Sequence, residues 1–96
     1  MPRNQKLTKV IAGRTIKAAT TEPGSVLILL DDQSRMKIKT AAPATVSPGS
    51  KIKSVLEAEA EFKIQFEDGS TATLRLADPG SSVAVRDKNN VVEYLG

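Results

Sequence analysis

Five basic residues in the middle of the chain have the spacing of a phosphate-binding surface. Arg35, Lys37 and Lys39 alternate with other residues, which in a β-strand would place all three cations on one face. Lys51 and Lys53 flank a single isoleucine in the same way. If the two strands were neighbours, the five cations would share one surface, and such a surface attracts nucleic acid through charge pairing and counterion release. These five residues are therefore the candidate site for nucleic acid or another anion.

The aromatic content of the chain weakens this interpretation. Small β-barrels that bind single strands usually stack the bases on aromatic side chains. The only aromatic residues are Phe62, Phe66 and Tyr94. Both phenylalanines are in phase with apolar neighbours and are expected in the core, which leaves Tyr94 as the one stacking platform. The alternative that we favour is a solvated sheet face, on which Lys51 and Lys53 pair across strands with the glutamates of residues 57–61.

Two pairs of acidic residues, Asp31-Asp32 and Glu67-Asp68, are the other candidates for chemistry. Paired carboxylates serve as calcium ligands or as an acid and base. Calcium requires six to eight oxygen ligands, and neither pair lies in a known calcium-loop spacing. Aspartate is also an ordinary turn residue because its side chain bonds the backbone two residues later. We therefore interpret both pairs as turns and expect no metal site.

Catalysis and cofactor binding have little support in the sequence. The chain has no histidine and no cysteine, which removes the commonest general base and the thiolate nucleophile. Ser50-Lys51 after Pro48-Gly49 resembles part of a phosphate-binding loop, but the second glycine of that motif is missing and a strand, not a helix, is expected next. We expect a protein that is not an enzyme and that has no cofactor.

The charge is unevenly distributed along the 96 residues, which are expected to form one domain. Residues 1–56 contain ten Lys or Arg against three acidic residues, whereas residues 57–96 contain four against eight, within a net charge of +3. Such asymmetry can mark a basic binding surface. The simpler alternative, which we favour, is that the two halves pack together and neutralise each other.

The two halves of the chain also resemble each other. Shifting the sequence by 36 residues aligns residues 10–45 with residues 46–81 without a gap and gives nine identical pairs, including Asp32 with Asp68 and Pro43 with Pro79. The order of turn and strand signals is the same in both segments. The pattern predicts an internal repeat of 36 residues.

Each repeat is predicted to be a meander of three strands. In the first repeat, strands are expected at residues 14–20, 25–31 and 35–41, and Pro23-Gly24 favours the first turn. In the second repeat, the alternation of apolar and polar residues over residues 56–67 indicates a strand rather than a helix. Either a turn forms near residues 57–60 or one long strand bends there. Asp68-Gly69 then predicts a hairpin.

The remaining segments complete an all-β prediction. Residues 82–96 are expected to form a C-terminal hairpin, and residues 1–9 a basic, mobile arm. The fold is expected to be a small barrel or a sandwich of two sheets. The longest apolar run, residues 26–30, is too short to cross a bilayer, and the N-terminus lacks the apolar stretch of a secretory signal. We therefore expect a cytoplasmic protein without a membrane partner.

Two functions remain open from the sequence. The first, which we favour, is a non-catalytic module that binds another protein or a second copy of itself, because exposed strands at the edge of a meander readily accept a partner strand. The second is a small β-barrel that binds nucleic acid through the basic strand face.

Overall fold

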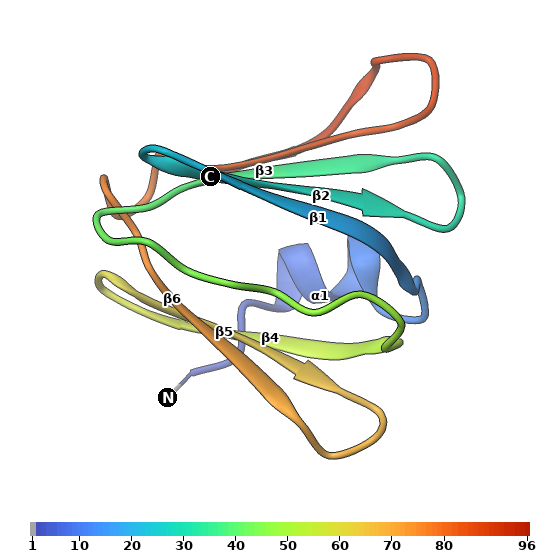
Figure 1. Cartoon of the computed structure of the whole chain (residues 1–96), viewed down its shortest axis with the longest axis horizontal. Coiled ribbons are helices and arrows are strands. Elements are labelled where there is room, and N and C mark those ends of the chain that lie inside the picture. The colour runs from blue at the N-terminus through green and yellow to red at the C-terminus, as the bar shows by residue number, and fades with distance from the viewer. Residues whose placement is uncertain (1) are drawn as a thin grey trace.

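The computed structural model describes residues 2–96, and these form one short helix and eight strands (Figure 1). The elements, in chain order, are α1 (Gln5–Ile11), β1 (Ile16–Glu22), β2 (Ser25–Leu30), β3 (Arg35–Lys39), β4 (Ile52–Ala58), β5 (Glu61–Phe66), β6 (Thr71–Arg75), β7 (Val83–Arg86) and β8 (Val92–Leu95). The predicted all-β class is confirmed, with the addition of one helix of seven residues.

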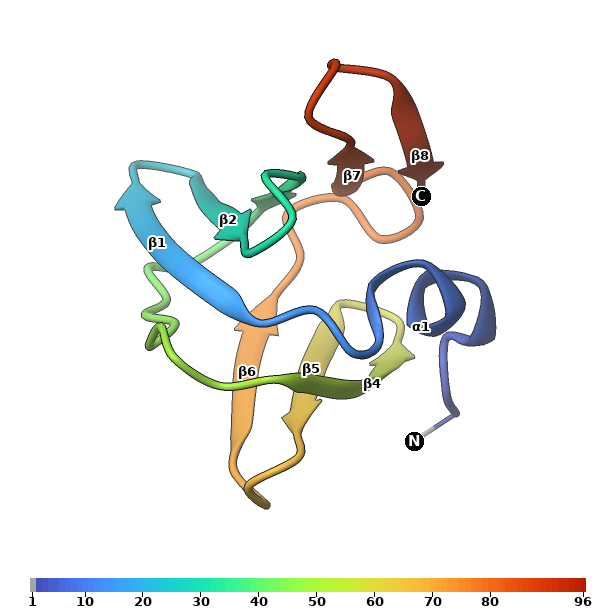
Figure 2. The same cartoon turned by 90° about the vertical axis from the view of Figure 1, so that its right-hand side faces the viewer.

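The strands form two antiparallel sheets that face each other (Figures 1 and 2). One sheet has five strands in the order β1-β2-β3-β7-β8, and the other has three in the order β4-β5-β6. The C-terminal hairpin β7–β8 thus extends the sheet of the first meander by pairing with β3. Residues 2–96 form these two sheets and not one closed barrel.

The core lies between the inner faces of the two sheets. Alternate residues of the strands point inward, as the period of two requires. The first sheet buries Val26, Ile28 and Leu30, and the second buries Phe62 and Phe66. The two phenylalanines are therefore core residues, as the sequence predicted. The outer faces of the sheets point away from each other, since both sheets pack on this one cluster of buried residues (Figure 1).

A turn separates β4 from β5, so the alternating segment does not form one long bent strand. The backbone of Glu59 adopts φ 53°, in the left-handed region, and the chain reverses there without glycine or proline. Such a conformation is uncommon for a residue other than glycine. The corresponding turn between β1 and β2 contains Gly24 at φ 78°. The two turns, at residues 23–24 and 59–60, thus lie 36 residues apart, although the residues that form them differ.

The N-terminal segment is not the mobile arm that the sequence analysis expected. The helix α1 begins after Asn4, whose side chain accepts a hydrogen bond from the backbone amide of Leu7 at 3.0 Å. The helix buries Leu7 and Ile11, and it contacts β4 and β8. The prediction counted the charges of this segment and overlooked that residues 7 and 11 share one face of a helix. Met1, the first residue of the predicted arm, lies outside the described residues.

The two meanders correspond closely in their geometry. Each of β4, β5 and β6 begins and ends 36 residues after β1, β2 and β3, respectively. Each first strand has an irregularity in its register at the same place, between Ile16 and Ala18 in β1 and between Ile52 and Ser54 in β4.

The hydrogen bonds between the two meanders are reciprocal. The amide of Gly13 donates to the carbonyl of Ile52 at 2.8 Å, and the amide of Gly49 donates to the carbonyl of Ile16 at 2.7 Å. The two bonds are equivalent, because Gly49 follows Gly13 by 36 residues and Ile52 follows Ile16 by the same number. Both glycines have positive φ, 88° and 104°. These bonds tie the start of each meander to the first strand of the other.

The ends of the third strands are tied in the same reciprocal way. The amide of Ala41 donates to the carbonyl of Arg75 at 2.9 Å, and the amide of Ala77 donates to the carbonyl of Lys39 at 3.0 Å. The two meanders therefore meet as equivalent partners at both ends, and β7 and β8 lie outside this relation.

Candidate functional site

The five basic residues proposed from the sequence do not share one surface. Arg35, Lys37 and Lys39 are exposed on the outer face of β3, in the five-stranded sheet. Lys51 forms an isolated bridge with Thr15, and Lys53 lies on β4, in the other sheet. The two strands are not neighbours, so the condition for a surface of five cations is not met.

The neighbour of β3 is β7, which brings a fourth cation to the same face. Arg86 of β7 lies directly opposite Arg35 in the antiparallel ladder. Like charges directly opposite each other on adjacent strands destabilise a sheet. The guanidinium of Arg86 donates a hydrogen bond to the carbonyl of Asn90 at 3.2 Å, within the hairpin β7–β8. We call the surface formed by Arg35, Lys37, Lys39 and Arg86 the cationic face.

The cations of this face have no carboxylate partner within residues 2–96. The ion pairs found there join Arg14 to Asp32 and to Glu93, and Lys63 to Glu61. The acidic residue of β1, Glu22, lies opposite Ser25, which in turn lies opposite Lys39. The positive charge of the cationic face is thus left uncompensated by the chain's own ion pairs.

Apolar side chains lie among these cations. Leu29 lies opposite Arg35 and Leu27 opposite Lys37 across the β2–β3 ladder, and both leucines are half-buried. On the other side of the face, Leu95 of β8 is 67% exposed. The cationic face therefore combines positive charge with partly exposed aliphatic side chains.

The edge strand β8 is the most apolar exposed part of the described chain. The exposed large hydrophobic residues are Val91 at 58%, Val92 at 41% and Leu95 at 67%. A shallow groove of about 280 Å³ separates β8 from α1, and its lining includes Lys6 and Val10. An exposed apolar edge strand is a template on which another chain can pair.

The free side of β8 also carries backbone hydrogen-bonding groups. Val83 and Gly96 exchange both of their backbone hydrogen bonds, at 2.8 and 2.9 Å. Because bonded and non-bonded pairs alternate along an antiparallel ladder, the amide and carbonyl of Leu95 point away from β7. A partner strand could bond to them on the same side as the groove.

The sequence analysis missed Arg86, Val92 and Leu95 as members of the candidate site. Arg86 was overlooked because nothing local to β3 or β7 shows that these strands are neighbours. The apolar residues of β8 were read as ordinary strand residues, although Val92 and Leu95 are two of the three exposed large hydrophobic residues in residues 2–96.

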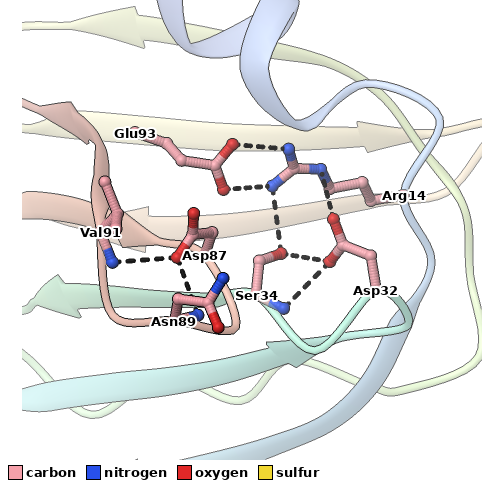
Figure 3. A network of polar contacts seen from close by, with 7 residues as sticks. All are labelled: Arg14, Asp32, Ser34, Asp87, Asn89, Val91 and Glu93. Atoms are coloured by element: carbon pink, nitrogen blue, oxygen red, sulfur yellow. Dashed lines mark hydrogen bonds and ion pairs between the residues drawn. The ribbon is translucent and has the colours of Figure 1, made fainter.

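A second polar cluster surrounds Arg14, which lies just before β1 (Figure 3). Its guanidinium forms two hydrogen bonds with the carboxylate of Glu93, at 3.0 and 2.9 Å, and Nε lies 3.1 Å from Asp32. Arg14 also donates to the hydroxyl of Ser34 at 3.0 Å. The hydrogen bonds that Arg14 donates to Glu93 and the nearby negative charges raise the pKa of Arg14, so this side chain is a permanent cation.

The acidic residues of this cluster serve the turns. Partial burial of Asp32 opposes its ionisation, but the hydroxyl and amide of Ser34 and the charge of Arg14 outweigh this effect and lower the pKa of Asp32. In the loop between β7 and β8, Asp87 accepts hydrogen bonds from the amides of Asn89 and Val91, at 2.8 and 2.9 Å (Figure 3). These hydrogen bonds of Asp32 and Asp87 stabilise the turns in which the two residues lie.

Asp68 occupies the corresponding position in the second meander. It accepts hydrogen bonds from the hydroxyl and the amide of Ser70, at 2.6 and 2.8 Å, and from the hydroxyl of Ser50 at 3.0 Å. The hydrogen bonds from Ser70, followed by that from Ser50, lower the pKa of Asp68. Ser50 thus stands where Arg14 stands in the first meander, and Asp68 lacks the cation that Asp32 has.

Comparison with known proteins does not assign the chain to a family. No helix among residues 2–96 has the length and apolar character needed to cross a bilayer. No protein-family model, curated protein sequence or solved structure matches the chain.

Proposed function

We propose that this protein is a non-catalytic binding module whose cationic face binds an acidic, partly apolar segment of another protein. The observation that carries the proposal is the pair Arg35 and Arg86, placed directly opposite each other on β3 and β7. The repulsion between the two guanidinium groups destabilises the sheet. A carboxylate from a partner would remove this repulsion, because a guanidinium binds a carboxylate with two parallel hydrogen bonds.

The apolar residues on the same face favour a protein partner over nucleic acid. Leu27, Leu29 and Leu95 lie among the cations and would meet apolar side chains of a partner. A binding surface for single-stranded nucleic acid would need exposed aromatic rings among its cations. Phe62 and Phe66 are buried instead, and the hydroxyl of Tyr94 accepts a hydrogen bond from Asn4 at 3.0 Å. Nucleic acid is therefore the second candidate, supported by charge alone.

The edge strand β8 supplies a place where such a segment could begin. An extended segment that pairs with the free backbone of Leu95 would lie in the groove beside α1, where Lys6 faces Val92 and Leu95 across the groove. Acidic residues of the segment would then meet Lys6 on one side and the cationic face on the other. Backbone pairing would provide affinity, and the flanking charges would select an acidic partner.

We also infer that the two meanders are copies of one unit and that the hairpin β7–β8 was added to it. The spacing of 36 residues between equivalent strands and the reciprocal hydrogen bonds support this inference. The hairpin supplies Arg86 to the cationic face and places Val92 and Leu95 beside it, and among residues 2–96 it has no counterpart in the second sheet. On this account, the meanders form the scaffold and the hairpin adds the binding function.

The test is an amide NMR titration with an extended peptide in which glutamate alternates with leucine. We expect chemical-shift changes on β3, β7 and β8, and an affinity that falls as salt rises. The charge reversal Arg35→Glu with Lys37→Glu should weaken binding by about tenfold or more, equivalent to about 1.4 kcal/mol. The matched control, Lys51→Glu with Lys53→Glu, changes the net charge equally on the other sheet and should weaken binding far less.

The same variants distinguish the proposal from its alternatives. Equal loss of binding in both double variants would show that net charge alone attracts the peptide, and this would overturn the proposed site. Saturable shifts with a mixed-sequence oligonucleotide but none with the peptide would favour the nucleic-acid function instead. We expect the Arg35→Glu with Lys37→Glu variant to remain folded, because Arg35→Glu replaces a repulsive pair with an attractive one, and its amide spectrum provides the check.

A further inference from the structure

The strand β6 lies at the edge of the three-stranded sheet, and the side of β6 that faces away from β5 carries free backbone groups. Leu76 donates its amide to the carbonyl of Ala60 at 2.7 Å, which fixes the phase of hydrogen bonding between β5 and β6. Since bonded and non-bonded pairs alternate, Leu74 and Ala72 bond to β5, and the amides and carbonyls of Thr71 and Thr73 point away from it. Among residues 2–96, no strand pairs with this side of β6.

The equivalent edge in the other sheet is occupied. Thr71 and Thr73 correspond, with a shift of 36 residues, to Arg35 and Lys37 of β3. There, β7 pairs with the outer edge of β3 in an antiparallel ladder. The amide of Lys39 donates to the carbonyl of Ser82 at 2.8 Å, and no equivalent of Ser82 exists beside β6. One of two equivalent strand edges therefore has a partner within the chain, and the other lacks one.

The strand β6 itself lacks the residues that usually prevent pairing at an edge. Proteins protect exposed edges with lysine, proline, bulges or covering loops. The first four residues of β6 are Thr, Ala, Thr and Leu, which include two β-branched residues and no charge, and the last is Arg75. The loop of residues 42–44 lines a pocket together with Thr73, Leu74 and Arg75, and Ala41 donates to the carbonyl of Arg75, so this loop lies beside the second half of the strand.

We propose that β6 pairs with β6 of a second copy of this chain, in an antiparallel arrangement with Ala72 on the two-fold axis. In this register Thr71 lies opposite Thr73 of the second copy, and Thr73 lies opposite its Thr71. The four free backbone groups of each strand would then form four hydrogen bonds between the copies. The paired strands would join the two three-stranded sheets into one sheet of six strands.

The side chains of β6 favour a second copy over an unrelated strand. The register places threonine opposite threonine, and such cross-strand pairs stabilise a sheet. It places no charge opposite a like charge, because Arg75 lies beyond the paired residues. On the inner face, Ala72 would meet its own symmetry mate, and two small side chains allow the strands to approach closely. A two-fold arrangement also closes on itself and leaves no further edge of β6 for growth.

The pairing is short, so the dimer is expected to be weak. Interfaces that bury less than about 1,200 Å² are typical of transient complexes. This interface lies on the three-stranded sheet, whereas the cationic face lies on the five-stranded sheet. The inference is therefore independent of the proposed function.

Sedimentation and NMR relaxation, measured from about 50 µM to about 1 mM, a range suited to weak complexes, test this inference. The apparent mass and the rotational correlation time should rise towards twice the monomer values with increasing concentration. Amide exchange of Thr71 and Thr73 should slow at the same time. Monomer values over the whole range would overturn the proposal.

Two double variants of β6 locate the contact. Thr71→Lys with Thr73→Lys places lysine opposite lysine and should abolish the dimer, whereas Thr71→Val with Thr73→Val keeps the β-branched shape and should preserve it. Thr73→Pro provides a second test, because it removes an amide that has no partner within the chain. A dimer that survives both the lysine variant and the proline variant would show that the copies meet elsewhere.

The same measurements separate this inference from the proposed function. Arg35→Glu with Lys37→Glu should leave the dimer unchanged, and Thr71→Lys with Thr73→Lys should leave binding of the acidic peptide unchanged. Loss of dimerisation in the first variant would mean that the copies associate through the cationic face, which would contradict the pairing of β6.

Discussion

The guanidinium of Arg14 forms two hydrogen bonds with the carboxylate of Glu93, 79 residues further along the chain (Figure 3). The pair joins the segment before the first strand to the last strand. The side chains are only 20% and 26% exposed, so solvent screens them incompletely. In the second meander, Ser50 occupies the position that corresponds to Arg14. The contact between Arg14 and Glu93 is therefore one of the features in which the two meanders differ.

This pair is expected to stabilise the docking of β8. In a double-mutant cycle with Arg14→Ala and Glu93→Ala, we expect a coupling free energy of about 1 kcal/mol, because the hydrogen bonds are charge-assisted and paired. Arg14→Lys should lose most of the coupling, since an ammonium group cannot form both bonds in one plane. Urea unfolding of the four proteins measures the coupling. Additive effects of the two alanine variants would contradict this role.

The helix α1 is expected to contribute to global stability. Leu7→Ala removes a fully buried side chain and should lower the free energy of unfolding by about 2–5 kcal/mol. Lys6→Ala, on the exposed side of the same helix, is the matched control and should change it by less than about 0.5 kcal/mol. Chemical denaturation provides the measurement. A mobile arm would show no difference between the two variants.

Gly13 and Gly49, which join the two meanders, are expected to contribute equally to the stability of the fold. Gly13→Ala and Gly49→Ala each place a side chain at positive φ, where an L-residue is disfavoured by roughly 1–2 kcal/mol. No neighbouring atom lies within 4 Å of the added carbon in either case, so the cost should come from the backbone alone. Thermal unfolding, with exposed Thr45→Ala as control, measures both. A neutral result at one glycine would show that the two positions are not equivalent.

Stability is expected to fall at acidic pH through the turn aspartates. The pKa values of Asp32 and Asp68 are lower in the folded protein than the ordinary value of about 3.9. The unfolded chain therefore binds more protons, and the stabilisation is present above about pH 4 and disappears as the pH falls through the folded values. The variant Asp32→Asn with Asp68→Asn should show a flatter acid limb in unfolding curves.

A control separates this effect from the removal of negative charge as such. Glu22→Gln removes a carboxylate that belongs to neither turn and should keep the acid limb of the unmodified protein. An acid limb in the double asparagine variant that is as steep as in the unmodified protein would exclude the two turns as its source.

If Arg35 and Arg86 are kept opposite each other for binding, removing the repulsion between them should stabilise the protein. The single change Arg35→Glu converts like charges on opposite strands into an ion pair and should raise the free energy of unfolding by roughly 0.2–1 kcal/mol. Lys53→Glu, at the register irregularity of β4 where no residue lies opposite, serves as the control. Denaturant unfolding at low salt measures the effect. A loss of stability in Arg35→Glu would remove the argument that this pair is kept for binding.

Much of the local structure followed from the sequence because strands and turns depend on neighbouring residues. Asp68-Gly69 marked the turn before β6, and the apolar alternation of residues 82–96 marked the hairpin β7–β8. The helix α1 was missed because its seven residues are too few to be stable alone. Its stability comes from the burial of Leu7 and Ile11, which depends on β4 and β8.

The sequence by itself determined which residues of β3 share one outward face. Arg35, Lys37 and Lys39 project from one face of β3 because side chains alternate along any strand. Only the tertiary structure decided which strands are neighbours: it placed Lys53 on the opposite sheet and brought Arg86 beside Arg35. Strand order depends on how both sheets bury their apolar faces in one core, and these long-range contacts have no signature in the spacing of residues along the chain.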